Sequence, residues 1–93
     1  MKLYTIKMDG KYIAGESEEF YSDKEVSAFL TNTGFHFSNK CGISKLKLSR
    51  NPDEALIICG IRNLHSWIDK LHTRVDSGLI SFKKMTIEEV GER

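Results

Sequence analysis

The sequence of residues 3–14, LYTIKMDGKYIA, predicts a β-hairpin. Asp9-Gly10 separates two stretches in which apolar and polar residues alternate, the pattern of a two-residue hairpin with a type I′ turn. Such a turn needs positive φ at both central residues, which Asp tolerates and Gly favours. The predicted cross-strand pairs are Met8 with Lys11, Ile6 with Ile13 and Tyr4 with Gly15.

This register gives the hairpin two unlike faces, because successive side chains of a strand point to opposite sides. The apolar face is formed by Tyr4, Ile6, Met8 and Ile13. The other face carries Thr5, Lys7 and Tyr12, which we expect to look outward. An isolated hairpin is marginal in water, so the rest of the chain must cover its apolar face. A free hairpin edge would allow either a monomer or a homodimer.

Two helices are predicted. Ser22-Asp23-Lys24-Glu25 matches a capping box and begins a short helix that ends at Gly34. The second helix ends at Gly78 and has the best amphipathic stripe of the chain. That stripe consists of Leu64, Trp67, Ile68, Leu71 and Val75.

Residues 51–75 allow two interpretations. Asn51, Pro52 and Glu54 would open a helix well, and one long helix could then run to Val75. Alternatively, residues 51–54 form a turn, residues 56–61 a buried strand, and the helix begins at Asn63. We favour the second interpretation, because residues 56–59 are apolar all round and Gly60 would weaken a helix.

Further strands are predicted at 43–49 and 79–90, from their alternation of apolar and polar residues. The order is then hairpin, helix, strand, strand, helix, strand, with no linker that would divide residues 1–93 into two domains. We predict a single α+β domain: an N-terminal β-hairpin within a mixed, mainly antiparallel sheet of about five strands, with two helices on one face.

Composition excludes some classes of protein and leaves others. The 14 basic and 13 acidic residues give a net charge of +1, without the basic excess that is typical of nucleic-acid-binding domains. The charges are nevertheless segregated, because residues 40–50 hold four basic residues and no acid, whereas Glu88, Glu89 and Glu92 form an acidic cluster. With two cysteines, no signal peptide and no membrane-spanning stretch, we expect a soluble cytoplasmic protein.

The sequence holds no catalytic motif and predicts no cofactor, so we expect no enzyme. His65, Asp69, His72 and Asp76 share one helical stripe, but the two histidines stand two turns apart, and we predict no metal site. Aromatic and basic residues alternate in a segment that could bind single-stranded nucleic acid. Its candidate residues are Phe35, Phe37, Lys40, Lys45, Lys47 and Arg50.

Residues 20–30, which read FYSDKEVSAFL, together with Trp67–Leu71 and Phe82–Met85, resemble small accessory proteins of phages and prophages of Gram-positive bacteria. The resemblance implies a small non-enzymatic protein that binds and inhibits a host protein, such as a defence nuclease. The expected contacts are the outer hairpin face and the acidic loop, the segment between hairpin and first helix that carries Glu16, Glu18 and Glu19. The candidate partner-binding residues are Lys7, Tyr12, Glu16, Glu18 and Glu19.

Overall fold

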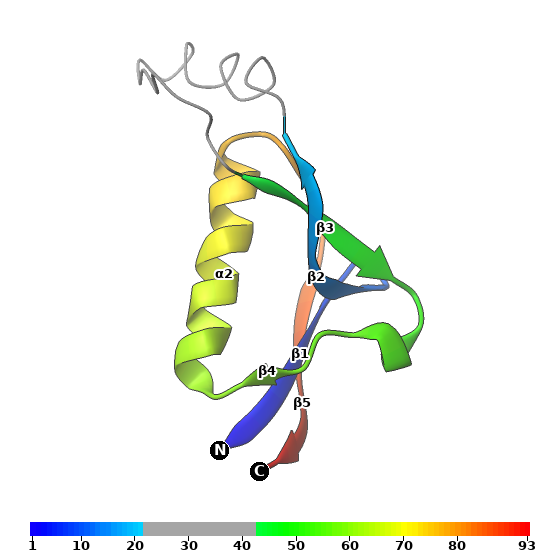
Figure 1. The fold of residues 1–93 in the computed structure, drawn as a ribbon, viewed down its shortest axis with the longest axis vertical. Helices are drawn as coiled ribbons and strands as arrows, with labels where there is room; N and C mark the ends of the chain where they lie inside the picture. The colour runs from blue at the N-terminus through cyan, green and yellow to red at the C-terminus, as the bar shows by residue number, and fades with distance from the viewer. Residues whose placement is uncertain (22–42) are drawn as a thin grey trace.

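A computed structural model describes residues 1–21 and 43–93 (Figure 1). It contains five strands, one α-helix and a 3-10 turn. They are β1 (Lys2–Met8), β2 (Lys11–Phe20), β3 (Ser44–Ser49), η1 (Pro52–Glu54), β4 (Ile58–Cys59), α2 (Ile61–Asp76) and β5 (Met85–Glu92).

The predicted α+β class and five-stranded sheet are confirmed, and every strand pair in the described residues is antiparallel. Of the two predicted helices, the described residues contain one, α2, which lies against one face of the sheet (Figure 1). The helix predicted from Ser22 to Gly34 lies outside the described residues.

The hairpin turn forms as predicted. Asp9 and Gly10 have φ values of 48° and 85°, and Met8 pairs with Lys11. The Asp9 carboxylate accepts hydrogen bonds from the backbone N–H groups of Lys83 and Lys84, at 2.9–3.1 Å. These bonds, with that from Lys83 the stronger cause, hold the pKa of Asp9 below its ordinary value. The turn is thereby fixed to the residues that lead into β5.

The rest of the predicted hairpin register is wrong. The two strands pair only at Met8–Lys11 and Lys7–Tyr12, and then they separate. Residues 55–59 occupy the gap: the N–H of Leu56 donates to the Ile13 carbonyl at 2.9 Å, and β4 pairs with the first half of β1. Tyr4 therefore lies opposite Ile58 rather than Gly15, which pairs with Lys47 of β3.

Within the described residues, β1 is paired on both sides, whereas β2 pairs with β3 on one side and with β1 only at Lys11 and Tyr12 on the other, so a dimer on the hairpin edge stays a prediction. β5 pairs with the whole length of β1 on one side, while β2 and β4 share the other side. β3 pairs with β2. Thr5 also departs from the prediction, because it is 3% exposed on the sheet face opposite α2, and its Oγ1 has no hydrogen-bond partner among the described residues.

The alternative of a strand followed by a helix is confirmed for residues 51–75, with different boundaries. The Asn51 side chain accepts from the Asp53 N–H at 3.0 Å and caps only the short turn η1. The strand is reduced to Ile58–Cys59, and α2 starts at Ile61, two residues earlier than predicted. The last strand starts later than predicted, at Met85.

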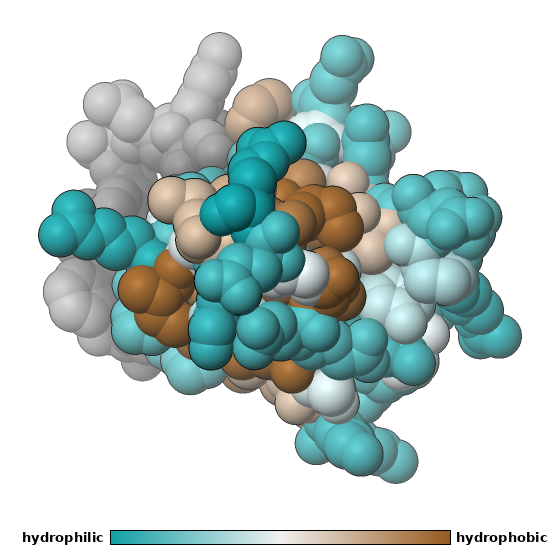
Figure 2. Space-filling model, turned by 90° about the horizontal axis from the view of Figure 1, so that it is seen from below, coloured by the Kyte–Doolittle hydropathy of each residue, from teal (hydrophilic) through white to brown (hydrophobic). Residues whose placement is uncertain are grey.

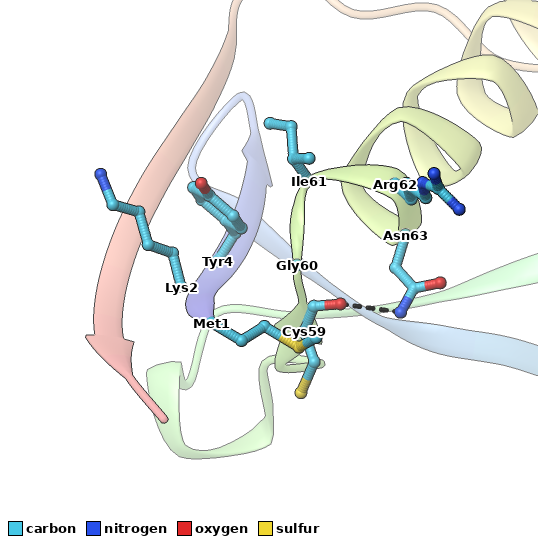
Figure 3. Close-up of a pocket in the computed structure, with 8 residues that line it drawn as sticks. All are labelled: Met1, Lys2, Tyr4, Cys59, Gly60, Ile61, Arg62 and Asn63. Atoms are coloured by element: carbon cyan, nitrogen blue, oxygen red, sulfur yellow. Dashed lines mark hydrogen bonds between the residues drawn. The ribbon is translucent and has the colours of Figure 1, made fainter.

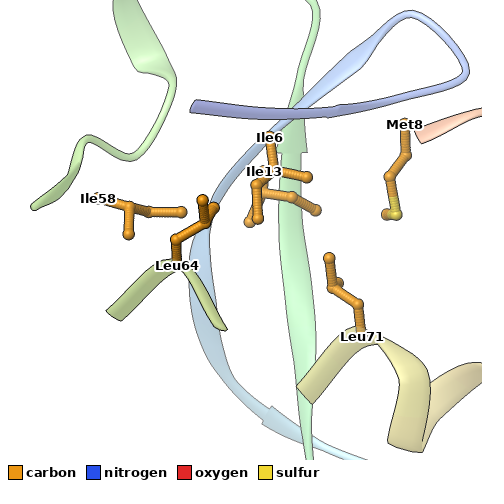
Figure 4. Close-up of a cluster of buried hydrophobic side chains, with 6 residues drawn as sticks. All are labelled: Ile6, Met8, Ile13, Ile58, Leu64 and Leu71. Atoms are coloured by element: carbon orange, nitrogen blue, oxygen red, sulfur yellow. The ribbon is translucent and has the colours of Figure 1, made fainter. Parts of the chain in front are cut away.

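The core lies between α2 and the sheet (Figure 4). Its buried apolar side chains are Ile6, Met8, Ile13, Ile58, Leu64 and Leu71. The predicted apolar faces of the hairpin and of α2 therefore meet each other, except at Val75, which was predicted on the stripe of the helix but is 37% exposed. The helix ends in a Schellman motif, because the N–H groups of Gly78 and Leu79 donate to the carbonyls of Val75 and Arg74 at 3.0 and 2.9 Å. Gly78 has a φ of 71°, as this motif requires.

Candidate docking site at the amino-terminal end of helix α2

The structure separates the candidate partner-binding residues into three environments. Lys7 and Tyr12 are cross-strand neighbours, with the Lys7 Nζ 5.1 Å from the centre of the Tyr12 ring. Glu18 and Glu19 are exposed near the end of β2, where Ser17 and Glu19 bond to each other locally. Glu16 belongs to a third environment, a partly exposed polar network between elements of the fold.

This network joins β2, β3 and α2. The Glu16 carboxylate accepts a hydrogen bond from Lys70 Nζ at 2.9 Å and another from Ser44 Oγ at 3.0 Å. The bond from Lys70, followed by that from Ser44, holds the pKa of Glu16 below its ordinary value. Arg74 is 4% exposed, and its guanidinium donates twice to the Ser44 carbonyl, at 2.8 and 3.1 Å. Glu16 thus supports the fold.

The candidate nucleic-acid residues are only partly placed. Lys45 and Lys47 lie on β3, and Arg50 is exposed just after it. Lys45 Nζ stands 5.7 Å from the centre of the Tyr21 ring. Phe35, Phe37 and Lys40 lie outside the described residues.

The polar stripe of α2 is exposed along its length. In the part of the chain that the structure describes, no three His, Cys, Asp or Glu side chains lie close enough together to hold a metal ion. The hydroxyl of Thr73 donates to the Asp69 carbonyl at 2.9 Å, a bond within the helix.

Apolar side chains gather instead at the end of the molecule where α2 begins and both termini lie (Figure 2). An open hollow of about 610 Å³ is found there between β1, β4 and the first turn of α2 (Figure 3). We call it the end hollow. Its lining consists of Met1, Lys2, Tyr4, Cys59, Gly60, Ile61, Arg62 and Asn63.

Large apolar side chains are exposed at the end hollow. Met1 is 67% exposed and Ile61 is 53% exposed. The Met1 side chain lies close to Gly60, where an added Cβ would stand 3.4 Å from the Met1 Cγ and Sδ atoms. In Figure 3, the Tyr4 and Ile61 side chains lie on the same side of the segment at Gly60 that joins β4 to α2.

The charge of the end hollow is positive. Lys2 and Arg62 line it, and none of the lining residues is acidic. Lys2 has one weak ion pair, at 3.7 Å from Glu89. The first turn of α2 holds no acid, and no side chain caps it, because its N-cap residue is Gly60. The Asn63 amide donates to the Cys59 carbonyl at 2.7 Å. The positive end of the helix dipole therefore adds to the two side-chain charges.

Sequence reasoning missed this site, because it assigned residues 56–61 to a strand buried on both faces. A short apolar run is a buried strand only if both of its faces are covered. The structure leaves Ile57 and Ile61 48% and 53% exposed, which the apolar run itself did not indicate.

Comparison of the chain with protein-family models, curated proteins and solved structures found no match. No helix in residues 1–21 and 43–93 is both long and apolar enough to cross a membrane.

Proposed function

We propose that this protein acts by binding another protein, which docks at the end hollow, and that it does not catalyse a reaction. The observation that carries the proposal is the exposure of Met1 and Ile61 around an apolar hollow. Contiguous apolar surface of this kind, with a polar rim, is typical of interaction sites on soluble domains. The docking surface in this proposal thus includes the start of β1 and lies away from the hairpin turn and the acidic residues of β2.

The lining defines the chemistry of the partner. A segment that fits would insert a large apolar side chain against Tyr4 and Ile61, because burying such a side chain supplies most of the binding energy. Acidic residues would flank that anchor, because Lys2 and Arg62 line the end hollow without a lining acid. The partner segment is therefore apolar at its centre and acidic at its sides.

The test is quantitative affinity capture with matched variants of the whole chain. The resemblance to phage accessory proteins makes a host lysate the first place to search. Ile61→Glu places a carboxylate in the end hollow, and a carboxylate in a first helical turn favours the helix itself. Val75→Glu is the control, because Val75 is exposed at the opposite end of α2.

We expect a protein that is captured by the wild type and by Val75→Glu, and whose recovery falls about tenfold or more with Ile61→Glu. Arg62→Ala should weaken the capture less, and should reduce its dependence on salt. If Ile61→Glu recovers the same proteins in the same amounts as the control, the end hollow is not the docking site.

A nucleic-acid-binding role is the second candidate, and the placement of Lys45 beside Tyr21 supports it. The measurement is a salt titration of binding to single-stranded DNA and RNA. Binding that weakens with salt and falls when Lys45, Lys47 and Arg50 are replaced by Glu supports this role. No binding at low salt excludes it.

A further inference from the structure

Two outer strands of the sheet, β3 and β5, carry opposite charges. Within the described residues, β3 pairs with no strand but β2 and β5 with no strand but β1, so each has one edge without a strand partner (Figure 1). On β3, the Ser44 carbonyl at the start of the strand accepts from Arg74 of α2. The sequence of β3 includes Lys45 and Lys47 and no acid, whereas β5 includes three glutamates and no base. A free edge presents unpaired N–H and C=O groups, which can pair with a strand of another chain.

The direction of the strands allows one copy to follow another. The order β3, β2, β1, β5 is antiparallel at each step, so β3 and β5 run in opposite directions. The β3 of a second copy, placed beside β5 of the first without reversal, therefore forms one more antiparallel pair. The helices of both copies then lie on the same face of the continuous sheet.

The unpaired main-chain groups of β5 and β3 are placed so that they can bond to each other. In a two-residue hairpin, the two residues beside the turn bond to each other through their main chains. The N–H and C=O groups of Met8 therefore point toward β2, and those of Lys7 point toward β5. The Asp9 N–H donates to the Lys84 carbonyl at 3.0 Å, which agrees with this alternation. Because Thr86 pairs with Lys7, the groups of Met85 and Ile87 point to the free edge of β5.

The same alternation applies on β3. The N–H and C=O groups of Tyr12 point away from β1, toward Ser49, with which Tyr12 pairs. The main-chain groups of Leu46 and Leu48 therefore point to the free edge of β3. In an antiparallel register that sets Ile87 opposite Leu46 and Met85 opposite Leu48, the free N–H and C=O groups of these four residues can therefore bond to each other.

The side chains fit in this register. Ile87 and Leu48 are 40% and 45% exposed on the face that carries α2, and both would gain an apolar neighbour. On the opposite face, Glu88 stands directly opposite Lys45, and opposite charges in such a cross-strand position attract. Pairing like edges would instead bring the lysines of two β3 strands together, or the glutamates of two β5 strands, and the repulsion of like charges disfavours a two-fold dimer.

From these observations we infer that the protein binds a second copy of itself head to tail, with β5 of one copy paired to β3 of the next. Such a contact uses two different surfaces, so it does not close at two subunits and continues to larger species. It leaves the end hollow of each copy out of the contact.

Sedimentation velocity of the whole chain, from micromolar to millimolar concentration at about 0.01 M salt, tests this inference, because charges are little screened there. The average mass should rise above 10.6 kDa with concentration and pass the dimer mass without a plateau. Glu88→Lys or Lys45→Glu alone should each weaken association about fivefold or more, since each replaces attraction by repulsion.

A mixture of Glu88→Lys with Lys45→Glu should restore association, because each contact between the two variants again joins opposite charges. Glu54→Lys, an equal charge change on η1, should leave the average mass of the wild type unchanged, as should Ile61→Glu in the end hollow. A monomer mass at every concentration, a plateau at the dimer mass, or no recovery in the mixture would overturn the inference. Loss of capture with Ile61→Glu is a separate result.

Discussion

Replacing Arg74 with alanine is expected to destabilise the protein more than any change of an exposed charge. The Arg74 guanidinium is buried, and it joins α2 to β3 through the Ser44 carbonyl and hydroxyl, at 2.8–3.1 Å. Its bond to the Lys70 carbonyl lies within the helix, so it adds little between elements. The bonds to Ser44 therefore determine the size of the effect.

Hydrogen bonds to a charged group contribute about 1.5–3 kcal/mol, and a buried acceptor left without a donor costs about 1–3 kcal/mol. Because the bonds to Ser44 form one unit, we expect the free energy of unfolding to fall by about 2–4 kcal/mol. A domain of this length has a total of roughly 5–14 kcal/mol, so the melting temperature should fall by about 10–30 °C.

The assay is urea denaturation followed by far-ultraviolet circular dichroism and by the fluorescence of Trp67, the single tryptophan. Arg62→Ala is the matched control, because Arg62 is exposed on the first turn of the same helix, and its free energy of unfolding should change by less than about 0.5 kcal/mol. Arg74→Lys keeps the positive charge but loses the forked set of N–H donors, so its free energy of unfolding should lie between those of Arg74→Ala and Arg62→Ala. The reasoning is refuted if Arg74→Ala is as stable as Arg62→Ala.

Three further predictions concern stability. The hydrogen bond from Lys70 lowers the pKa of Glu16, so the wild type should lose stability as the pH falls from 4.5 through the lowered pKa, and Glu16→Gln should show a smaller loss across that window in urea titrations. An equal slope in both proteins would contradict this. Gly78→Ala should cost about 1–2 kcal/mol from its positive φ alone, because an added Cβ meets nothing within 4 Å; Gly78→Asn should cost less in the same melts, and equal costs would count against the motif. Leu71→Ala should cost about 2–5 kcal/mol and Val75→Ala much less, since Leu71 is fully buried and Val75 is 37% exposed; similar melting temperatures for the two variants would refute the packing of α2.

The sequence by itself determined the local features whose physics is local. The Asp9-Gly10 turn, the Gly78 helix end and the stripe of Leu64 and Leu71 each depend on residues within a few positions of one another. The apolar face of the hairpin followed from the alternation of a strand. These predictions agree with the structure, whereas Thr5, which was expected to look outward on the other face, is buried.

Tertiary structure alone decided the path of the sheet. Nothing in residues 3–14 shows that residues 55–59 would enter between the strands, because that pairing joins segments more than forty residues apart in the printed sequence. In this inserted segment only Ile58 and Cys59 form a strand, and Ile57 and Ile61 on either side of it are exposed. The end hollow lies beside this strand. The partners of Arg74 and Glu16 also come from distant elements, and their charges gave no sequence signal.

The two edges of the sheet combine both sources. The sequence showed a basic stretch and an acidic cluster, because charge can be counted along the chain. Their positions on separate edges follow from the strand pairing, in which, among the described residues, β3 pairs only with β2 and β5 only with β1. Charge is a property of single residues, whereas which edge a strand occupies depends on every other pairing in the sheet.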